Sequence, residues 1–154
     1  MAADTSVNDS AKTAMMLQQF GAFANATQGK EQLITLENDL IKLTLTTRGG
    51  KILRTHLKNY KTYDGLPLIT NTGDSSVFGL NFFSQNRSIT TDSLFFEASD
   101  DGFKVTKNEK KSFVLRLNAG AGKYIEYVYT LTGNDYRVGF KINFVNVNDV
   151  VAGN

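Results

Sequence analysis

Hydrophobic and polar residues alternate with a period of two over much of the chain beyond residue 33. The alternating hydrophobic positions fall in four clear runs: Ile41, Leu43 and Leu45; Phe113, Leu115 and Leu117; Ile125, Tyr127, Tyr129 and Leu131; and Tyr136, Val138, Phe140, Ile142 and Phe144. Phe78, Leu80 and Phe82 form a further candidate run. Because successive side chains of a strand point to opposite faces, each run predicts a strand with one buried, hydrophobic face and one solvent-exposed, polar face.

Short segments rich in Gly, Asn and Asp separate these runs. They are residues 37–39, 48–50, 63–65, 71–74, 100–102, 119–122 and 132–135. Such residues tolerate positive φ or cap a turn with their side chains. Short strands at this spacing, with one proline and no helical period between them, predict an all-β fold of antiparallel sheets packed as a sandwich.

The first 30 residues lack this alternation and predict a linker with a short helix. We expect the helix to start at about Ser10, with Ser10 as its N-cap. Its hydrophobic stripe is Met15, Met16, Leu17, Phe20 and Phe23. The stripe is expected to dock on the domain or on a neighbouring copy, and the alternative is a membrane-proximal linker. Residues 1–30 are therefore assigned to the linker and residues 31–154 to the β-sandwich domain.

Composition narrows the classes of function without naming one. The chain has 154 residues, a formal charge of +2, no Cys and one His. This charge is far below a nucleic-acid-binding footprint, so no nucleic-acid partner is predicted. The missing thiols exclude disulfides, thiolate metal sites and cysteine nucleophiles. Residues 1–4 carry no cationic leader, and no apolar stretch approaches the roughly 20 residues that span a bilayer.

The individual polar residues do not predict chemistry either. His56 lies in a predicted strand at residues 51–58, with Ile52 and Arg54 on its own face and no carboxylate at a useful spacing. The acidic pairs at residues 37–39 and 100–101 flank turns, where capping explains them. The run at residues 119–122 lacks the Lys-Ser/Thr ending of a phosphate loop. We therefore predict no catalytic residue, no metal site and no cofactor, and classify the chain as a non-enzyme.

Two blocks of sequence carry a family resemblance. Residues 34–52, ITLENDLIKLTLTTRGGKI, form a strand, the motif Thr47-Arg48-Gly49-Gly50 and a second strand. Residues 123–131 and 135–146 form a later hairpin. In this order, the blocks resemble the large periplasmic domain of the bacterial YidC membrane protein insertase family, over residues 31–148. Gly49 and Gly50 permit a chain reversal and Arg48 can bond exposed carbonyls, so the motif is expected to be structural.

The resemblance implies a β-supersandwich similar to galactose mutarotase, placed in the periplasm as part of an inner-membrane protein. It also implies a non-catalytic role that assists insertion and folding of inner-membrane proteins, with no cofactor. The partners implied are Sec translocon subunits and nascent membrane proteins. The family domain is longer than residues 31–154, so we expect a domain truncated at its C-terminal end. Its open strand edges would favour a homodimer.

Two other functions remain open. A carbohydrate-binding or sugar-processing sandwich is suggested by the fold and by Tyr124, Tyr127, Tyr129 and Tyr136. The single His and the lack of Trp count against it. A secreted structural or adhesin module is the third possibility. The sequence predicts no partner-binding residue for any of the three.

Overall fold

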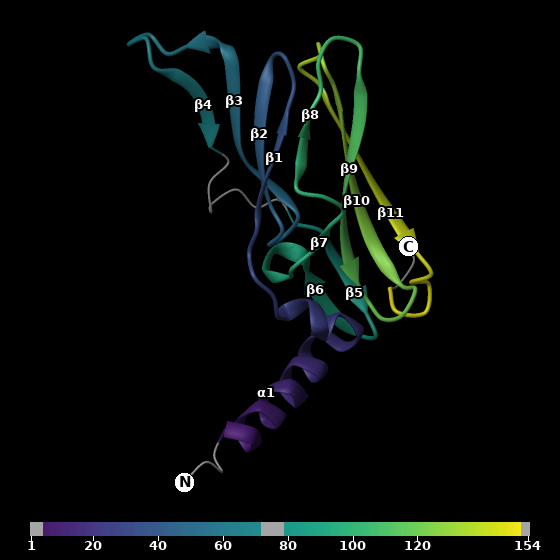
Figure 1. Cartoon of the computed structure of the whole chain (residues 1–154). Helices are drawn as coiled ribbons and strands as arrows, with labels where there is room; N and C mark the ends of the chain where they lie inside the picture. Colours follow the sequence, from purple (N-terminus) through teal and green to yellow (C-terminus); the bar gives the residue numbers. More distant parts are fainter. Residues whose placement is uncertain (1–4, 72–78, 152–154) are drawn as a thin grey trace.

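Two main β-sheets pack face to face in the computed structural model, which describes residues 5–71 and 79–151 (Figure 1). The helices are α1 (Thr5–Phe20) and the short 3-10 helices η1 (Gly21–Thr27) and η2 (Thr91–Ser93). The strands are β1 (Leu33–Glu37), β2 (Ile41–Thr46), β3 (Lys51–Lys61), β4 (Pro67–Asn71), β5 (Asn81–Ser84), β6 (Arg87–Thr90), β7 (Glu97–Ala98), β8 (Gly102–Lys104), β9 (Lys110–Asn118), β10 (Tyr124–Thr132) and β11 (Val138–Val145).

The first sheet has the strand order β4-β3-β2-β1-β8 and the second has β11-β10-β9-β7. A separate hairpin is formed by β5 and β6. Neighbouring strands are antiparallel, except that β1 and β8 run parallel. The predicted all-β sandwich with a short N-terminal helix is therefore confirmed, with one parallel pair added.

The hydrophobic core lies between the two sheets and follows the predicted alternation. Fully buried side chains come from β2 (Ile41, Leu43 and Leu45), β9 (Phe113, Leu115 and Leu117) and β10 (Ile125, Tyr127, Tyr129 and Leu131). Phe96, which precedes β7, stacks against Tyr127 with ring centroids 4.7 Å apart. Each fully buried Leu or Phe contributes about 1.5–3 kcal/mol, so these strands supply much of the stability.

Two strands differ from the sequence prediction. Leu53 is an extra residue in β3, because Thr44 lies opposite Arg54 while Leu45 lies opposite Ile52. This bulge moves Ile52 off the face of Arg54 and His56 and packs it against the core. In β11, the face predicted to be buried is partly exposed to solvent, because β11 is the end strand of its sheet. Phe144 on this face is 50% exposed. Phe78 of the remaining candidate run lies outside the described residues.

The N-terminal helix also differs from its prediction. It begins at Thr5, so Ser10 lies inside it and is not its N-cap. Residues 5–9 contain neither Gly nor Pro, which lets the helix extend beyond the predicted start. The hydrophobic stripe docks only at its C-terminal end: Phe23 is fully buried against Phe82, whereas Met15 is 68% exposed. The rest of α1 extends away from the sheets (Figure 1).

The motif at residues 47–50 forms the turn between β2 and β3 and joins the two sheets. Phe96 N–H donates to the carbonyl of Thr47, and Gly49 N–H donates to the carbonyl of Leu94, both at 2.8 Å. The Tyr129 hydroxyl donates to the carbonyl of Gly50 at 2.5 Å. Burial raises the pKa of Tyr129 well above its usual range, which keeps this donor protonated.

Gly50 sits where a side chain has no room. Its φ is +64°, and a Cβ there would lie 3.0 Å from Cδ2 of Tyr127 and 3.3 Å from Cδ1 of Phe96. Both ring atoms belong to the packed core, so they cannot swing away. The position therefore combines a left-handed backbone with a steric limit.

A second tie lies at the other end of β2, where the buried side chain of Asn38 links the β1–β2 turn to the β10–β11 turn. Its Nδ2 donates to the carbonyls of Thr132 and Asp135, both at 2.7 Å. Its Oδ1 accepts from the N–H groups of Leu40 at 2.8 Å and Ile41 at 2.7 Å. All hydrogen-bonding groups of this amide are thereby used, two toward each turn.

Gly50→Ala should destabilise the chain more than Gly65→Ala does. Gly65 is a matched control because its φ is +78° and no atom lies within 4 Å of the Cβ site. Gly65→Ala should cost about 1–2 kcal/mol for the left-handed backbone alone. Gly50→Ala should cost that amount plus about 1–3 kcal/mol for overpacking. Urea unfolding measures both, and equal losses would contradict a close contact with the two rings.

Asn38→Asp should lower the free energy of unfolding by about 2–4 kcal/mol at neutral pH. A carboxylate has almost the same shape but cannot donate to the carbonyls of Thr132 and Asp135, so two acceptors and a charge are left buried. Asn134→Asp, in the exposed part of the neighbouring turn, is the matched control and should change the stability little. A loss of the same size in both variants would show that the side chain of Asn38 does not hold the two turns together.

Candidate functional site

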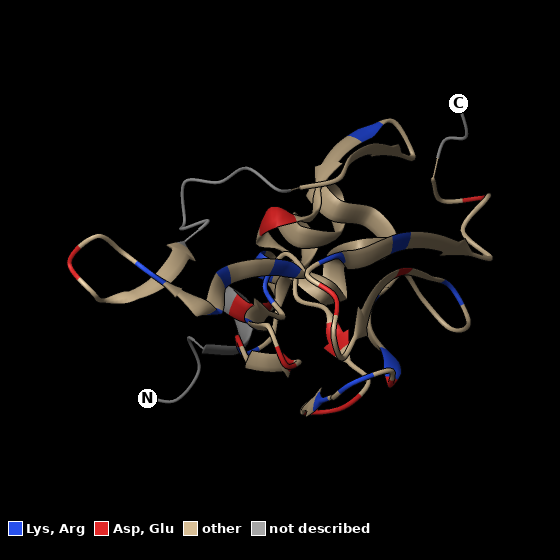
Figure 2. Ribbon diagram, turned by 90° about the horizontal axis from the view of Figure 1, so that it is seen from above, with Lys and Arg blue, Asp and Glu red and all other residues tan. Residues whose placement is uncertain are grey.

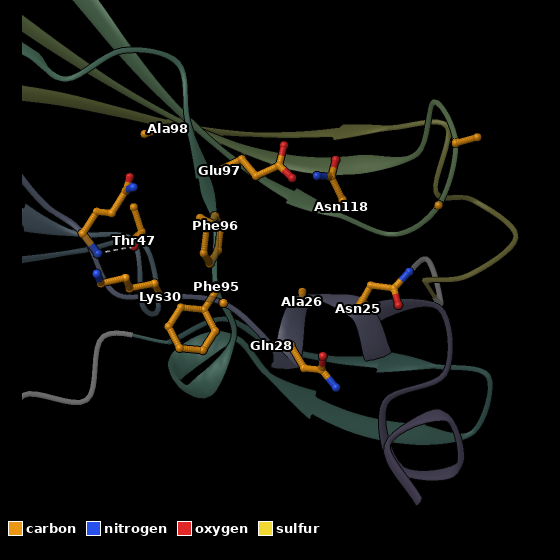
Figure 3. Close-up of a pocket in the computed structure, with 14 residues that line it drawn as sticks. Asn25, Ala26, Gln28, Lys30, Thr47, Phe95, Phe96, Glu97, Ala98 and Asn118 are labelled. Carbon is orange, nitrogen blue, oxygen red and sulfur yellow. Dashed lines mark hydrogen bonds between the residues drawn. The ribbon is translucent and has the colours of Figure 1, made fainter. Parts of the chain in front are cut away.

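A pocket of about 710 Å³ opens at the end of the sandwich nearest η1 (Figure 3). One wall comes from η1 and the segment that follows it, and the other comes from β7 and the β9–β10 turn. Its polar side chains are those of Asn25, Gln28, Lys30, Gln32, Thr47, Glu97 and Asn118. Phe95 and Phe96 add apolar surface between the walls.

Asn25 of η1 is exposed on the pocket side because the residues on either side of it are buried. Ala24 and Ala26 are buried, so Asn25 between them is exposed. The carbonyl of Ala26 accepts from the N–H of Phe95 at 2.7 Å, which fixes η1 against the chain leading into β7. Gly29 packs closely against the ring of Phe95. A Cβ added at Gly29 would lie 2.9 Å from Cγ of this ring.

The opposite wall is an open strand edge. Glu97 and Ala98 of β7 pair with Arg116 and Leu115 of β9 on one side. Since β7 is the end strand of its sheet, no described strand pairs with its other side. The side chains of Glu97 and Asn118 extend toward one another above this edge (Figure 3).

The polar groups of the pocket are available to a ligand. Among the described residues, no hydrogen bond or ion pair within the chain engages the side chains of Asn25, Gln28, Lys30, Glu97 or Asn118. Amide side chains both donate and accept, as a peptide backbone or a sugar hydroxyl does. Together with the ring of Phe95, they suit a polar, extended ligand better than a compact apolar one.

Of the four residues of the motif at residues 47–50, one lines this pocket. Thr47 lines the pocket and holds Gln32 in place, because its Oγ1 accepts from Gln32 N–H at 2.9 Å and its own N–H donates to the Gln32 carbonyl at 3.0 Å. Arg48 instead lines a smaller hollow of about 270 Å³ with Glu31, Lys51 and Asp92. Gly49 and Gly50 are buried behind the turn.

The other polar residues considered from the sequence stay apart from the pocket. His56 lies between Lys42 and Ile69 in the first sheet. Glu37 binds the ammonium of Lys58, and this hydrogen bond holds the pKa of the carboxyl below its usual value. Asp39 accepts from the N–H of Lys107.

Neither the distribution of charges nor a cluster of metal-ligating side chains marks a further site in the part of the chain that the structure describes. Lys and Arg are interspersed with Asp and Glu around the molecule rather than gathered on one face (Figure 2). Within residues 5–71 and 79–151, no three His, Asp or Glu side chains group as metal ligands. None of the described helices is both long enough and apolar enough to cross a membrane.

The sequence did not predict the pocket. Asn25 and Gln28 lie in the polar segment assigned to the linker and Gln32 lies just after it, while Glu97 and Asn118 lie at a strand and a strand end far along the chain. The only signal was the density of amide side chains between residues 25 and 32. Nothing in that density indicated the facing wall.

Comparison with known proteins identifies relatives that match most of this chain. The YidC periplasmic domain family matches residues 33–152. A membrane protein insertase YidC of Azobacteroides pseudotrichonymphae is 37% identical over 128 residues, covering 83% of this chain and 20% of the relative. The protein of that name from Parabacteroides distasonis is 34% identical over 145 residues, covering 94% and 22%. A third, from Chlorobium phaeovibrioides, is 33% identical over 141 residues, covering 88% and 24%.

The chain thus spans between a fifth and a quarter of the length of these relatives. The match runs through the β2–β3 turn with its two glycines and through the β9–β10–β11 meander, which are the two blocks that carried the resemblance. The chain belongs to the YidC periplasmic domain family, as its sequence predicted, and is a periplasmic domain.

Proposed function

We propose that this chain is a non-catalytic interaction domain of a membrane protein insertase, which binds extended polypeptide segments in the pocket beside β7. The relatives are named as membrane protein insertases, which supports the insertase context. The observation that carries the binding role is the set of polar side chains in the pocket that have no partner within the described residues. Nascent membrane proteins and Sec translocon subunits are the partners we propose.

The pocket suggests how such a segment would be held. An extended chain laid along β7 could add to the second sheet as a further strand. Its remaining N–H and C=O groups would meet the amides of Asn25, Gln28 and Asn118, and one side chain would rest on Phe95. Because β7 has only two residues, the added pairing is short. Binding of this kind is weak and readily reversed, which suits a domain that contacts many different sequences.

The two parts of the chain would divide this role. We propose that residues 1–30 act as a linker, whose last part also supplies the η1 wall of the pocket, and that residues 31–154 form the β-sandwich domain with the facing wall. The direction of α1, away from the sheets, supports this division (Figure 1). We also propose that Thr47, Arg48, Gly49 and Gly50 are structural residues, with Thr47 shaping the pocket wall.

A carbohydrate ligand is the second candidate, because amides beside an aromatic ring also suit sugar hydroxyls. The tyrosines that suggested it do not contribute to the pocket. Tyr127 and Tyr129 are buried in the core, and Tyr136 packs beside Tyr60 with ring centroids 6.3 Å apart. The sugar would therefore depend on Phe95 for stacking, and Phe95 is itself partly covered by Gly29.

Asn118→Ala should weaken binding of an extended peptide by about 2- to 10-fold, the effect of one lost hydrogen bond. The probe is a short fluorescein-labelled peptide of alternating valine and threonine, titrated by fluorescence anisotropy against the 154-residue chain. Asn59→Ala, at an exposed position of β3 outside the pocket, is the matched control and should leave the affinity unchanged.

Two further probes decide between the candidates. A peptide with prolines at alternate positions cannot donate along a strand edge, so it should bind more weakly than the valine–threonine peptide. A panel of neutral oligosaccharides should not compete with the peptide. Competition by a sugar that depends on Asn118 would favour the carbohydrate function, and equal binding to both variants would overturn the pocket as the site.

A further inference from the structure

We propose that the pocket beside β7 selects peptide segments that carry one acidic and one basic side chain, which Lys30 and Glu97 recognise from opposite walls. The inference rests on the peptide-binding function proposed above and names the class of segment that the pocket prefers. Both side chains are exposed and line the pocket, and neither has a hydrogen bond or ion pair within the described residues. Because a fixed charge attracts its opposite, the pair adds a charge preference to the amide groups around it.

The ammonium group of Lys30 is not balanced by the carboxylate that follows it in the sequence. Glu31 accepts a hydrogen bond from the hydroxyl of Thr46 at 2.6 Å and lines the separate hollow of about 270 Å³. The backbone of Gln32 is bonded to Thr47, as described above, which holds the segment in place. Lys30 therefore presents its charge to the pocket, while the neighbouring acid is used elsewhere.

Glu97 also lacks the partner that its position in the sheet provides. Arg116 of β9 lies directly opposite it, where opposite charges on neighbouring strands usually attract each other. The guanidinium of Arg116 instead donates to Glu126 at 3.2 Å and lies 4.5 Å from the centre of the ring of Tyr124. Arg116 is thus held toward β10, and the carboxylate of Glu97 stays available beside Asn118 (Figure 3).

The two charges lie apart in the pocket and do not neutralise each other. Figure 3 shows Lys30 close to Thr47 and Glu97 close to Asn118, with the ring of Phe96 between the two groups. An extended segment with one charge of each sign satisfies both walls. A segment with two like charges places one of them beside a charge of its own sign, so it gains less.

This preference narrows the part of a membrane protein that the pocket would hold. A membrane-spanning stretch consists of about 20 predominantly apolar residues and offers no charge to either wall. The polar segments that flank such stretches carry charged side chains of both signs. The pocket therefore suits the flanking segments rather than the spanning stretches themselves.

Charged versions of one peptide test the preference separately from peptide binding. The reference is the valine–threonine peptide described above, and in the further probes one threonine is replaced by Asp, another by Lys, or both are replaced. In fluorescence anisotropy, the Asp and Lys peptides should each bind roughly 2- to 5-fold more tightly than the reference, the effect of one exposed ion pair. The peptide with both charges should bind most tightly. Salt at about 1 M should remove these gains, because it screens exposed charges.

Two variants assign each gain to its wall. Lys30→Gln should remove the gain of the Asp peptide and keep that of the Lys peptide, and Glu97→Gln should do the reverse. Both positions are exposed, so neither change disturbs the core. Lys61→Gln and Asp64→Asn, at exposed positions of the β3–β4 hairpin, are the matched controls for the loss of one charge and should keep both gains.

The outcomes distinguish the charge preference from the binding function. Equal binding of the neutral and charged peptides, or gains that persist in both variants, would overturn the charge preference, while the effect of Asn118→Ala would still support a peptide site. Binding of none of the peptides, or binding that Asn118→Ala does not change, would overturn the peptide-binding function and the preference with it.

Discussion

The hydrogen bond from the Tyr129 hydroxyl to the carbonyl of Gly50 is the contact on which the arrangement of the two sheets depends. It connects the middle of β10 to the turn that ends β2. The bond can form only because Gly50 has no Cβ, which allows the turn to rest on the ring of Tyr127. The same turn accepts from Phe96 and donates to Leu94, so it also fixes the chain that leads into β7. One wall of the pocket is therefore placed by a contact inside the core, and a disturbance of that contact would reach the pocket without touching its polar groups.

The hydrogen bonds of Asn38 hold the other end of β2 against the second sheet, so both ends of this strand are linked across the sandwich. Both links lie toward the middle of the sheets, near β2 and β10. Near β4 and β11, the aromatic pair of Tyr60 and Tyr136 is partly exposed. Because the two sheets are linked near their central strands, their end strands can remain partly uncovered.

The sequence predicts the parts of this fold that have a local signal. Period-two runs identified β2, β9 and β10 together with their buried faces, and the paired glycines identified the tight turn. The bulge at Leu53 carried no such signal, because it depends on how Thr44 and Leu45 are matched by a different strand. Asn38 was read only as a turn residue, since its partners Thr132 and Asp135 are 94 and 97 residues away. The pocket was missed for the same reason: its walls come from segments that meet only after folding.

The shifted pKa values of the buried tyrosines have a structural cause, which lies in the core. Strongly shifted pKa values often mark reactive groups in clefts. Here the pKa values of Tyr127 and Tyr129 are raised by burial, and both hydroxyls are used in hydrogen bonds, to Thr91 and to Gly50. These shifts report the packing of the core and belong to groups that do not line the pocket. What the pocket offers instead is a set of amide donors and acceptors, with the charged side chains of Lys30 and Glu97, next to an open strand edge. Amide groups of this kind can pair with the N–H and C=O groups that all extended polypeptides share, so the binding function proposed above needs no acid, base or metal in the pocket.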